Sequence, residues 1–232
     1  MKTRHTMYAI VAMLLLTAFN SLAMAQDKKV KEAGEESAKA ANALREIMSI
    51  PEKAIPRNVF DEADCVAVFP STIKGGFIIG VRKGDGLLSC RTADGWSTPV
   101  FLDLSGGSVG AQIGAQSTDY VLLFMNRDGV NKVLNNKLTL GGEASVAAGP
   151  VGREAGASTD WKLSSQILSY SRSKGLFAGV ELKGVVISID DSDMKAVYGG
   201  QKPQDVLMGG KTVAPEILAF PNELTHYSTR SN

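Results

Sequence analysis

The sequence predicts an α+β domain. An antiparallel β-sheet curls into a barrel-like or sandwich form, and an N-terminal helix and short C-terminal helices pack outside it. Three observations lead to this prediction. Residues 26–48 repeat small and apolar side chains at helical spacing, short apolar runs separated by glycines fill residues 65–126, and the residues after 190 break into short helical patterns. Many short strands with frequent turns are typical of sandwiches and barrels.

The first 25 residues have the pattern of a cleavable export signal. Lys2 and Arg4 supply positive charge, residues 8–19 are apolar, and Ala23-Met24-Ala25 is a small-x-small cleavage site before Gln26. The apolar run is short for a membrane span, which needs about 20 residues. An uncleaved N-terminal anchor is the alternative. Residues 26–232 have the length of a single domain and show no linker that would divide them.

The charge balance and the motifs exclude several classes of protein. The chain has 25 basic and 24 acidic residues, whereas a nucleic-acid-binding protein would show a strong basic excess. It has no phosphate-binding loop, no dinucleotide fingerprint and no zinc-ligand spacing, so we expect no cofactor and no metal. His226 is the single histidine after the signal and lies near the C-terminus, which leaves a Cys or Ser nucleophile without an evident base. We therefore expect a protein that is not an enzyme, with a hydrolase using Asp or Ser as an alternative.

Cys65 and Cys90 are the two cysteines of the chain. An even pair in an exported protein predicts a disulfide, which would stabilise the fold by about 3 kcal/mol on the chain-entropy model. Two buried free thiols are the alternative.

The helix over residues 26–48 has an apolar face that is mostly alanine in its first half. Such a face can pack on a sheet or lie on a lipid surface, and the mixed charges of its other side favour packing. Pro51 and Pro56 then interrupt the chain, and Pro56 can open a short helix through Ala63.

Strands are expected next, in an order set by glycine turns. We expect strands over residues 65–69, 76–81 and 86–91, with a hairpin turn at 83–86 and a second turn at 93–95. Strands over 96–104 and 108–116 flank a turn at 105–107, and residues 120–126 form an apolar strand covered on both faces. A helix over 128–136, a strand over 166–171 and a hairpin of 176–182 with 185–189 around Lys183-Gly184 follow, then short helical pieces at 193–198, 203–208 and 215–224.

Residues 140–157 are unusually rich in small side chains, because ten of these eighteen residues are Gly or Ala. Such a segment is needed where two backbones, or a backbone and a ligand, come close. Arg153 emerges between Gly152 and Gly156, and a cation in such surroundings needs an anionic partner or a route to water. A glycine-rich loop with a surface arginine is the alternative.

Four segments in this order resemble the SYLF domain, a lipid-binding module: residues 95–102 (GWSTPVFL), 106–126, 140–155 and 169–184 (SYSRSKGLFAGVELKG). The resemblance covers roughly residues 38–218. It implies a compact fold of strands with helices outside, and a role in binding phosphoinositides or similar anionic phospholipids. Eukaryotic members are associated with actin patches and carry SH3 or FYVE modules. This chain has neither module, and its export signal makes actin an unexpected partner. The combination implies a single-domain bacterial member in the periplasm that contacts a membrane peripherally.

A lipid head group requires cations and backbone donors, and its tails require an apolar slot. We expect Arg153, Arg172 and Lys174 to face one anionic site with Phe77 and Phe177 beside it, and Lys74 precedes Gly75-Gly76-Phe77 in a similar arrangement. In the alternative, Arg153 and Arg172 pair with Asp160, Glu154 or Glu181 to hold the small-residue core together. Residues 190–193 (DDSD) are acidic enough for Ca²⁺ but lack the remaining ligands, so a turn with a helix cap is expected there. An envelope protein that docks a partner through its N-terminal helix is the second function considered.

Overall fold

The computed structural model describes residues 2–49, 54–76, 79–109, 115–135, 137–152, 165–173, 176–180, 182–209 and 213–228. Its helices are α1 (Lys2–Met48), α2 (Arg57–Glu62), α3 (Arg127–Asn135), α5 (Asp191–Tyr198), α6 (Pro203–Leu207), the 3-10 helix η2 (Pro215–Leu218) and α7 (Ala219–Tyr227). Its strands are β1 (Cys65–Gly76), β2 (Ile79–Thr92), β3 (Gly95–Trp96), β4 (Val100–Val109), β5 (Ala115–Phe124), β6 (Lys137–Thr139), β7 (Val146–Ala148), β8 (Ile167–Ser173), β9 (Leu176–Gly179) and β10 (Val186–Ile189).

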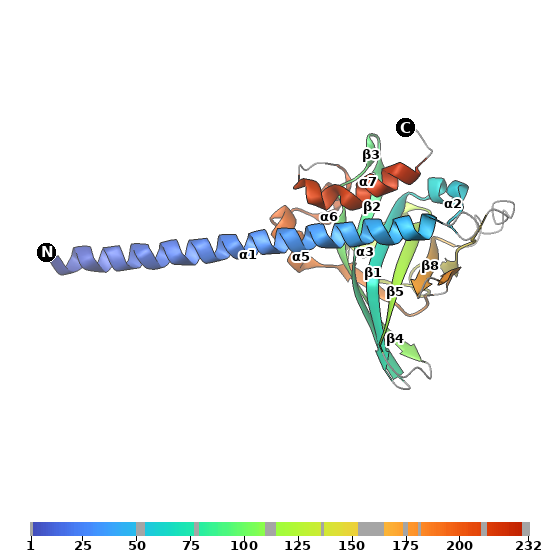
Figure 1. The fold of residues 1–232 in the computed structure, drawn as a ribbon, viewed down its shortest axis with the longest axis horizontal. Coiled ribbons are helices and arrows are strands. Elements are labelled where there is room, and N and C mark those ends of the chain that lie inside the picture. The colour runs from blue at the N-terminus through green and yellow to red at the C-terminus, as the bar shows by residue number, and fades with distance from the viewer. Residues whose placement is uncertain are drawn as a thin grey trace.

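One curled sheet organises the fold. Its strands follow the order β6-β10-β4-β2-β1-β5-β8-β7, with β3 beside β2 and β9 beside β8. Among the described strands, every pair is antiparallel except β7 with β8, so the sheet is mixed rather than purely antiparallel. Figure 1 shows the long α1 crossing the sheet, with the C-terminal helices beside it. The predicted α+β class with helices outside a curled sheet is confirmed.

Helix α1 packs on the sheet through its small and apolar face. Ala33, Ala40, Leu44 and Ile47 are buried, as the helical spacing predicts. Ser37 lies in the same buried stripe, and its hydroxyl is satisfied there by two hydrogen bonds. Its Oγ donates to the carbonyl of Ile217 at 2.8 Å and accepts from the backbone amide of Phe220 in α7 at 3.0 Å. The hydroxyl thus satisfies backbone groups where η2 passes into α7. Of the helices in the described ranges, none contains a stretch that is long and apolar enough to cross a bilayer.

The central strands supply the rest of the core. The side chains of residues 120–124 on β5 are all buried, which confirms the expectation that this strand is covered on both faces. Val68, Leu88 and Phe101 on the neighbouring strands are likewise buried. Helix α3 and the three C-terminal helical pieces form close to the residues expected for them.

Two predicted glycine turns were wrong, because β2 continues through residues 83–86 and β4 through 105–107. The glycines of β2 serve close packing instead. A Cβ atom on Gly84 would lie 2.3 Å from Thr72 Oγ1, and one on Gly86 would lie 2.4 Å from Phe69 Cδ1. A glycine in a strand interior marks such a close approach as readily as it marks a turn.

The predicted hairpin around Lys183-Gly184 was also wrong. Strand β9 pairs with β8, whereas β10 pairs with β4 and β6 toward the other end of the sheet. Gly184 does adopt a left-handed φ of 76°, so the turn itself forms. Local signals detect the turn, but the partner of each strand depends on the rest of the sheet.

The small-residue segment that begins at Leu140 makes a close backbone contact, as far as it is described. The Gly149 amide donates to the carbonyl of Ser169 at 3.1 Å. A Cβ on Gly149 would lie 2.0 Å from the ring of Tyr170, and one on Gly179 would lie 2.1 Å from the Gly149 carbonyl oxygen. Glycine at both positions therefore lets β7, β8 and β9 meet.

Candidate functional site

Arg172 is held between two carboxylates from different elements. Its Nη2 donates to Asp119 Oδ2 at 2.6 Å, and its Nη1 forms an ion pair with Glu46 of α1. Asp119 stands directly opposite Arg172, because β5 and β8 pair in that register. The Arg172 side chain is 25% exposed and that of Asp119 is 11% exposed, so this pair is largely shielded from water. Arg172 thus ties α1 to the sheet.

Asp119 has a second structural role. Its Oδ1 accepts from the backbone amide of Ser71 at 2.8 Å. Ser71 has a φ of 52°, and it lies where β1 shifts register against β5 between Phe69 and Thr72. The carboxylate therefore holds a bulge in β1 as well as the guanidinium of Arg172. The sequence hypothesis considered acidic partners for Arg172 but not Asp119 or Glu46.

The other predicted ligands are only partly described. Arg153, Lys174 and Phe77 lie outside the described residues, as does the side chain of Phe177, whose backbone pairs in register with Arg172. Lys74 is described, and it stands opposite Gln116 of β5. Because side chains alternate along β5, Lys74 and Arg172 project from opposite faces of the sheet. The structure does not bring these two cations together.

Lys74 instead lies beside a second cation. It stands directly opposite Arg82 of β2, and the guanidinium of Arg82 lies 5.1 Å from the centre of the Tyr120 ring. Arg82 Nε is buried and has no hydrogen-bond partner among the described residues. Lys83, the next residue, is exposed on the other face. None of these three cations forms an ion pair with a described carboxylate.

Two apolar side chains are exposed close to these cations. Ile73 is 59% exposed and Val81 is 68% exposed. Ile73 stands opposite Lys83, and Val81 opposite Gly75, so both project from the face that carries Lys83. The sequence analysis missed Arg82, Ile73 and Val81, because a turn was expected at 83–86 and the pairing of β1 with β2 was not predicted.

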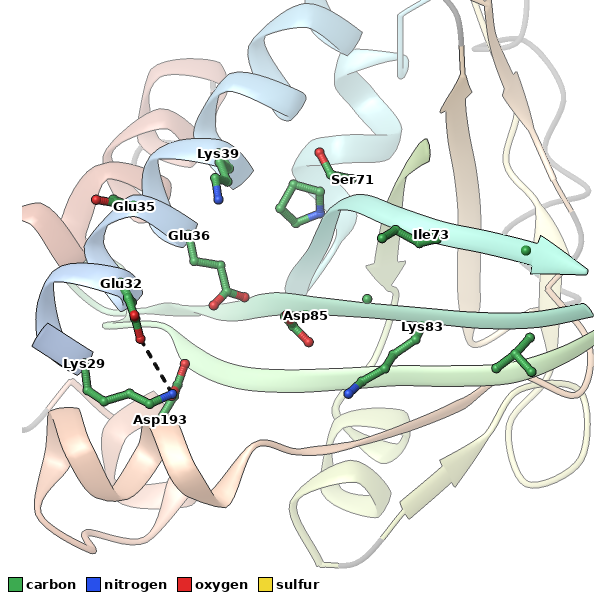
Figure 2. Close-up of a pocket in the computed structure, with 14 residues that line it drawn as sticks. Lys29, Glu32, Glu35, Glu36, Lys39, Ser71, Ile73, Lys83, Asp85 and Asp193 are labelled. Atoms are coloured by element: carbon green, nitrogen blue, oxygen red, sulfur yellow. Dashed lines mark hydrogen bonds and ion pairs between the residues drawn. The ribbon is translucent and has the colours of Figure 1, made fainter. Parts of the chain in front are cut away.

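A cleft of about 720 Å³ separates this part of the sheet from α1. Figure 2 shows Glu36 of α1 pointing across it toward Asp85 of β2, with Lys83 and Ile73 farther along the strands. Burial, together with the charges of Asp85, Asp193 and Asp190, raises the pKa of Glu36 to about 8, and Lys39 offsets this only in part. Lys29 and Asp193 also line the cleft, and they form an ion pair with an N–O distance of 2.9 Å. The end of the cleft lined by Glu36, Asp85 and Asp193 is acidic. The other end, lined by Ile73, Val81 and Lys83, is apolar and basic.

The two cysteines face each other on adjacent strands and are bonded. Cys65 of β1 stands opposite Cys90 of β2, their Cα atoms lie 4.0 Å apart, and both side chains are fully buried. The bond therefore lies in the core, away from the exposed cations.

The acidic run at 190–193 forms a helix cap. Asp190 precedes α5, and its side chain accepts from the amides of Ser192 and Asp193 at 2.8 and 3.0 Å. In the part of the chain that the structure describes, no group of three or more His, Cys, Asp or Glu side chains is arranged to hold a metal ion.

Comparison with known proteins reveals one family. A family model named Ysc84, described as Las17-binding protein actin regulator, matches residues 105–227. An SH3 domain-containing protein of Schizosaccharomyces pombe is 36% identical over 168 residues, which is 71% of this chain and 39% of that protein. Protein YSC84 of Saccharomyces cerevisiae is 33% identical over 189 residues, covering 78% and 40% of the two chains. SH3 domain-containing YSC84-like protein 1 of Homo sapiens is 35% identical over 183 residues, covering 75% and 53%. The match thus spans between 39% and 53% of the length of these relatives.

Proposed function

The chain belongs to the Ysc84 family, whose domain is the SYLF domain, and from this premise we propose that it is a lipid-binding protein that recognises anionic phospholipid head groups. The family is described as a Las17-binding actin regulator, which names a binding and regulatory role rather than an enzymatic one. The proposed role is accordingly binding, without a catalytic step.

The observation that carries this proposal is a set of cations that form no ion pair with a described carboxylate. Residues 72–84 and 104–118 include Lys74, Arg82 and Lys83 and contain no Asp or Glu. Like charges opposite each other on adjacent strands are destabilising, and Lys74 and Arg82 are such a pair. A phosphate group between them would relieve the repulsion.

The proposed location is the periplasm, at a membrane surface. The charged start, apolar run and small-x-small site of residues 1–25 support export by a cleavable signal. Mass spectrometry of the protein recovered from the periplasmic fraction should show an N-terminus at Gln26. An intact N-terminus in a cytoplasmic fraction would contradict this part of the proposal.

Vesicle sedimentation tests the binding function. The chain from Gln26 onward should sediment with phosphatidylcholine vesicles that contain phosphatidylglycerol, or a phosphoinositide, and not with phosphatidylcholine alone. Each Lys or Arg near an anionic surface contributes about 1 kcal/mol. Replacing Lys74, Arg82 and Lys83 by Gln should therefore weaken binding by roughly 100-fold. Failure of the unmodified chain to sediment with any vesicle would overturn the function.

A matched control separates this site from net charge. Lys137, Lys195 and Lys202 are exposed cations elsewhere on the surface, and replacing all three by Gln changes the net charge equally. This variant should bind almost as the unmodified chain does. Charge reversal at Arg153, a ligand predicted from sequence, adds a further arm, and a large loss there would extend the site beyond these three cations.

A protein partner is the second candidate function, and one structural observation favours it. A groove of about 650 Å³ runs between α1 and the C-terminal helices, and its apolar lining includes Val30, Ala38 and Ala219. Together with the family's description as Las17-binding, this groove supports a docking role for α1. Crosslinking from a photoreactive residue at Ala38 in cells would test it. Capture of one protein, together with a failure to bind vesicles, would favour this second function.

A further inference from the structure

Four adjacent strands, β4, β2, β1 and β5, end together at the end of the sheet that carries the exposed cations. Val109 of β4 pairs with Ile79 of β2, Gly80 of β2 pairs with Gly76 of β1, and Gly75 pairs with Ala115 of β5. Figure 1 shows these strand ends extending away from α1 and α7. We call the described residues 72–76, 79–84, 104–109 and 115–118 the distal strand segment.

The distal strand segment carries cations on both faces at nearly one level along the strands. Lys74 pairs with Arg82, and the adjacent pair is Ile73 with Lys83. Successive residues differ by about 3.3 Å along a strand, so the three cations lie within roughly that distance of a common level. Lys83 projects from the face turned toward α1, whereas Lys74 and Arg82 project from the other face.

Two apolar side chains of the distal strand segment, Ile73 and Val81, are left uncovered. Val81 stands between Gly75 on β1 and Gly107 on β4, and neither glycine has a side chain to shield it. Ile73 is its diagonal neighbour on the same face. Along the strands, Val81 lies closer to the end of the sheet than the cations do, and Ile73 lies at the level of Lys83.

We propose that the distal strand segment inserts end-on, strand ends first, into the head-group layer of an anionic bilayer, with Val81 reaching the acyl chains, Ile73 in the head-group layer, and Lys74, Arg82 and Lys83 contacting phosphates around them. This inference rests on the lipid-binding function proposed above and assigns its site and its geometry. Cations on both faces fit an approach with the strand ends first, because a sheet lying flat would present only one face to the phosphates. The three cations, none of which forms an ion pair with a described carboxylate, commit the surface to an anionic partner.

Site-specific labelling tests this geometry. Cys65 and Cys90 are the two cysteines of the chain and are bonded and buried, so one introduced cysteine can be labelled without reductant. The environment-sensitive dye NBD is attached in separate variants at Ile73→Cys, Val81→Cys and, as a control, Met208→Cys. Met208 is 78% exposed and follows α6, outside the distal strand segment.

Labels at positions 73 and 81 should brighten and shift to the blue on adding vesicles that contain phosphatidylglycerol. Lipids with a spin label on the acyl chain should quench the label at 81 more strongly than the label at 73, and should leave the label at 208 unchanged. Sedimentation of the same samples measures binding independently. Vesicle binding without any change at 73 or 81 would overturn the insertion and leave the lipid-binding function intact, whereas absence of binding would overturn both.

Two further experiments test the apolar contact and the possibility that a second copy of the chain covers this surface. Replacing Ile73 and Val81 together by Ser should weaken vesicle binding by about tenfold or more, since each side chain loses apolar burial, with no change in the circular dichroism of the fold. Unchanged affinity in this variant would overturn the proposal. A label at 81 that becomes protected with rising protein concentration, in the absence of vesicles, would show that a second copy of the chain covers this surface instead.

Discussion

Arg172 on β8 and Asp119 on β5 stand opposite each other in register, and the guanidinium of Arg172 donates to the carboxylate of Asp119 at 2.6 Å. Glu46 of α1 completes the contact from the other side of Arg172. A residue expected to bind a ligand thus connects the helix to the sheet. Lys74, Arg82 and Lys83, by contrast, form no ion pair with a described carboxylate, and all three lie on the distal strand segment.

Replacing Arg172 by Met should destabilise the fold by about 2 kcal/mol, because the largely buried Asp119 carboxyl would lose its cationic hydrogen-bond partner. Arg45→Met is the control, since Arg45 also pairs with a carboxylate but is 55% exposed, and its loss should matter less. Urea unfolding of both variants measures the difference. Equal losses would show that the contact at Asp119 has no special weight.

The stability of the fold should depend on the protonation of Glu36. Its pKa rises from an ordinary 4.5 to about 8 on folding, so the folded state holds this proton between those pH values while the unfolded state releases it. The contribution of Glu36 is therefore fully favourable below pH 4.5 and is lost as the pH rises toward 8, by an amount on the order of 5 kcal/mol.

The variant Glu36→Gln removes this dependence. Its free energy of unfolding, minus that of the unmodified chain, should grow steadily as the pH rises from 4.5 to 8. Glu35→Gln, at the exposed neighbouring position, is the matched control for removing one carboxyl group from this helix. A constant difference for Glu36→Gln would rule out the buried protonated carboxyl.

Gly149→Ala should destabilise the fold by about 2–3 kcal/mol, because the new methyl group would overlap the buried Tyr170 ring. Gly107→Ala is the matched control, since a Cβ there meets nothing within 4 Å and the residue is exposed. Thermal unfolding compares the two. The close approach of β7 to β8 would be contradicted if both substitutions were tolerated equally.

Removing the disulfide through Cys65→Ala and Cys90→Ala should cost about 3 kcal/mol, since the bond spans 25 residues of the chain. Vesicle binding by the folded variant should be retained, because both cysteines are buried in the core and lie outside the distal strand segment. Denaturant unfolding measures the first effect and sedimentation the second. A loss of binding at a protein concentration and temperature where the variant is folded would show that the bond also shapes the lipid site.

Local periodicity in the sequence was sufficient to predict the elements whose signal lies within a few neighbouring residues. The helical face of residues 26–48, the buried strand at 120–124 and the cap at Asp190 depend on side chains one to four positions apart. Glycine was harder to interpret, because the same residue type serves a turn at Gly184 and a close contact at Gly84 and Gly86.

The sequence by itself determined the class of the fold, the family and the supply of cations. Only the tertiary structure decided which cations are neutralised, because Arg172 meets Asp119 and Glu46 through strand pairing and helix packing between residues 53 and 126 positions apart. The same long-range register placed Lys74 beside Arg82 and left Val81 uncovered between two glycines. Register joins residues far apart in the chain, and periodicity within one segment carries no information about which partner it will meet.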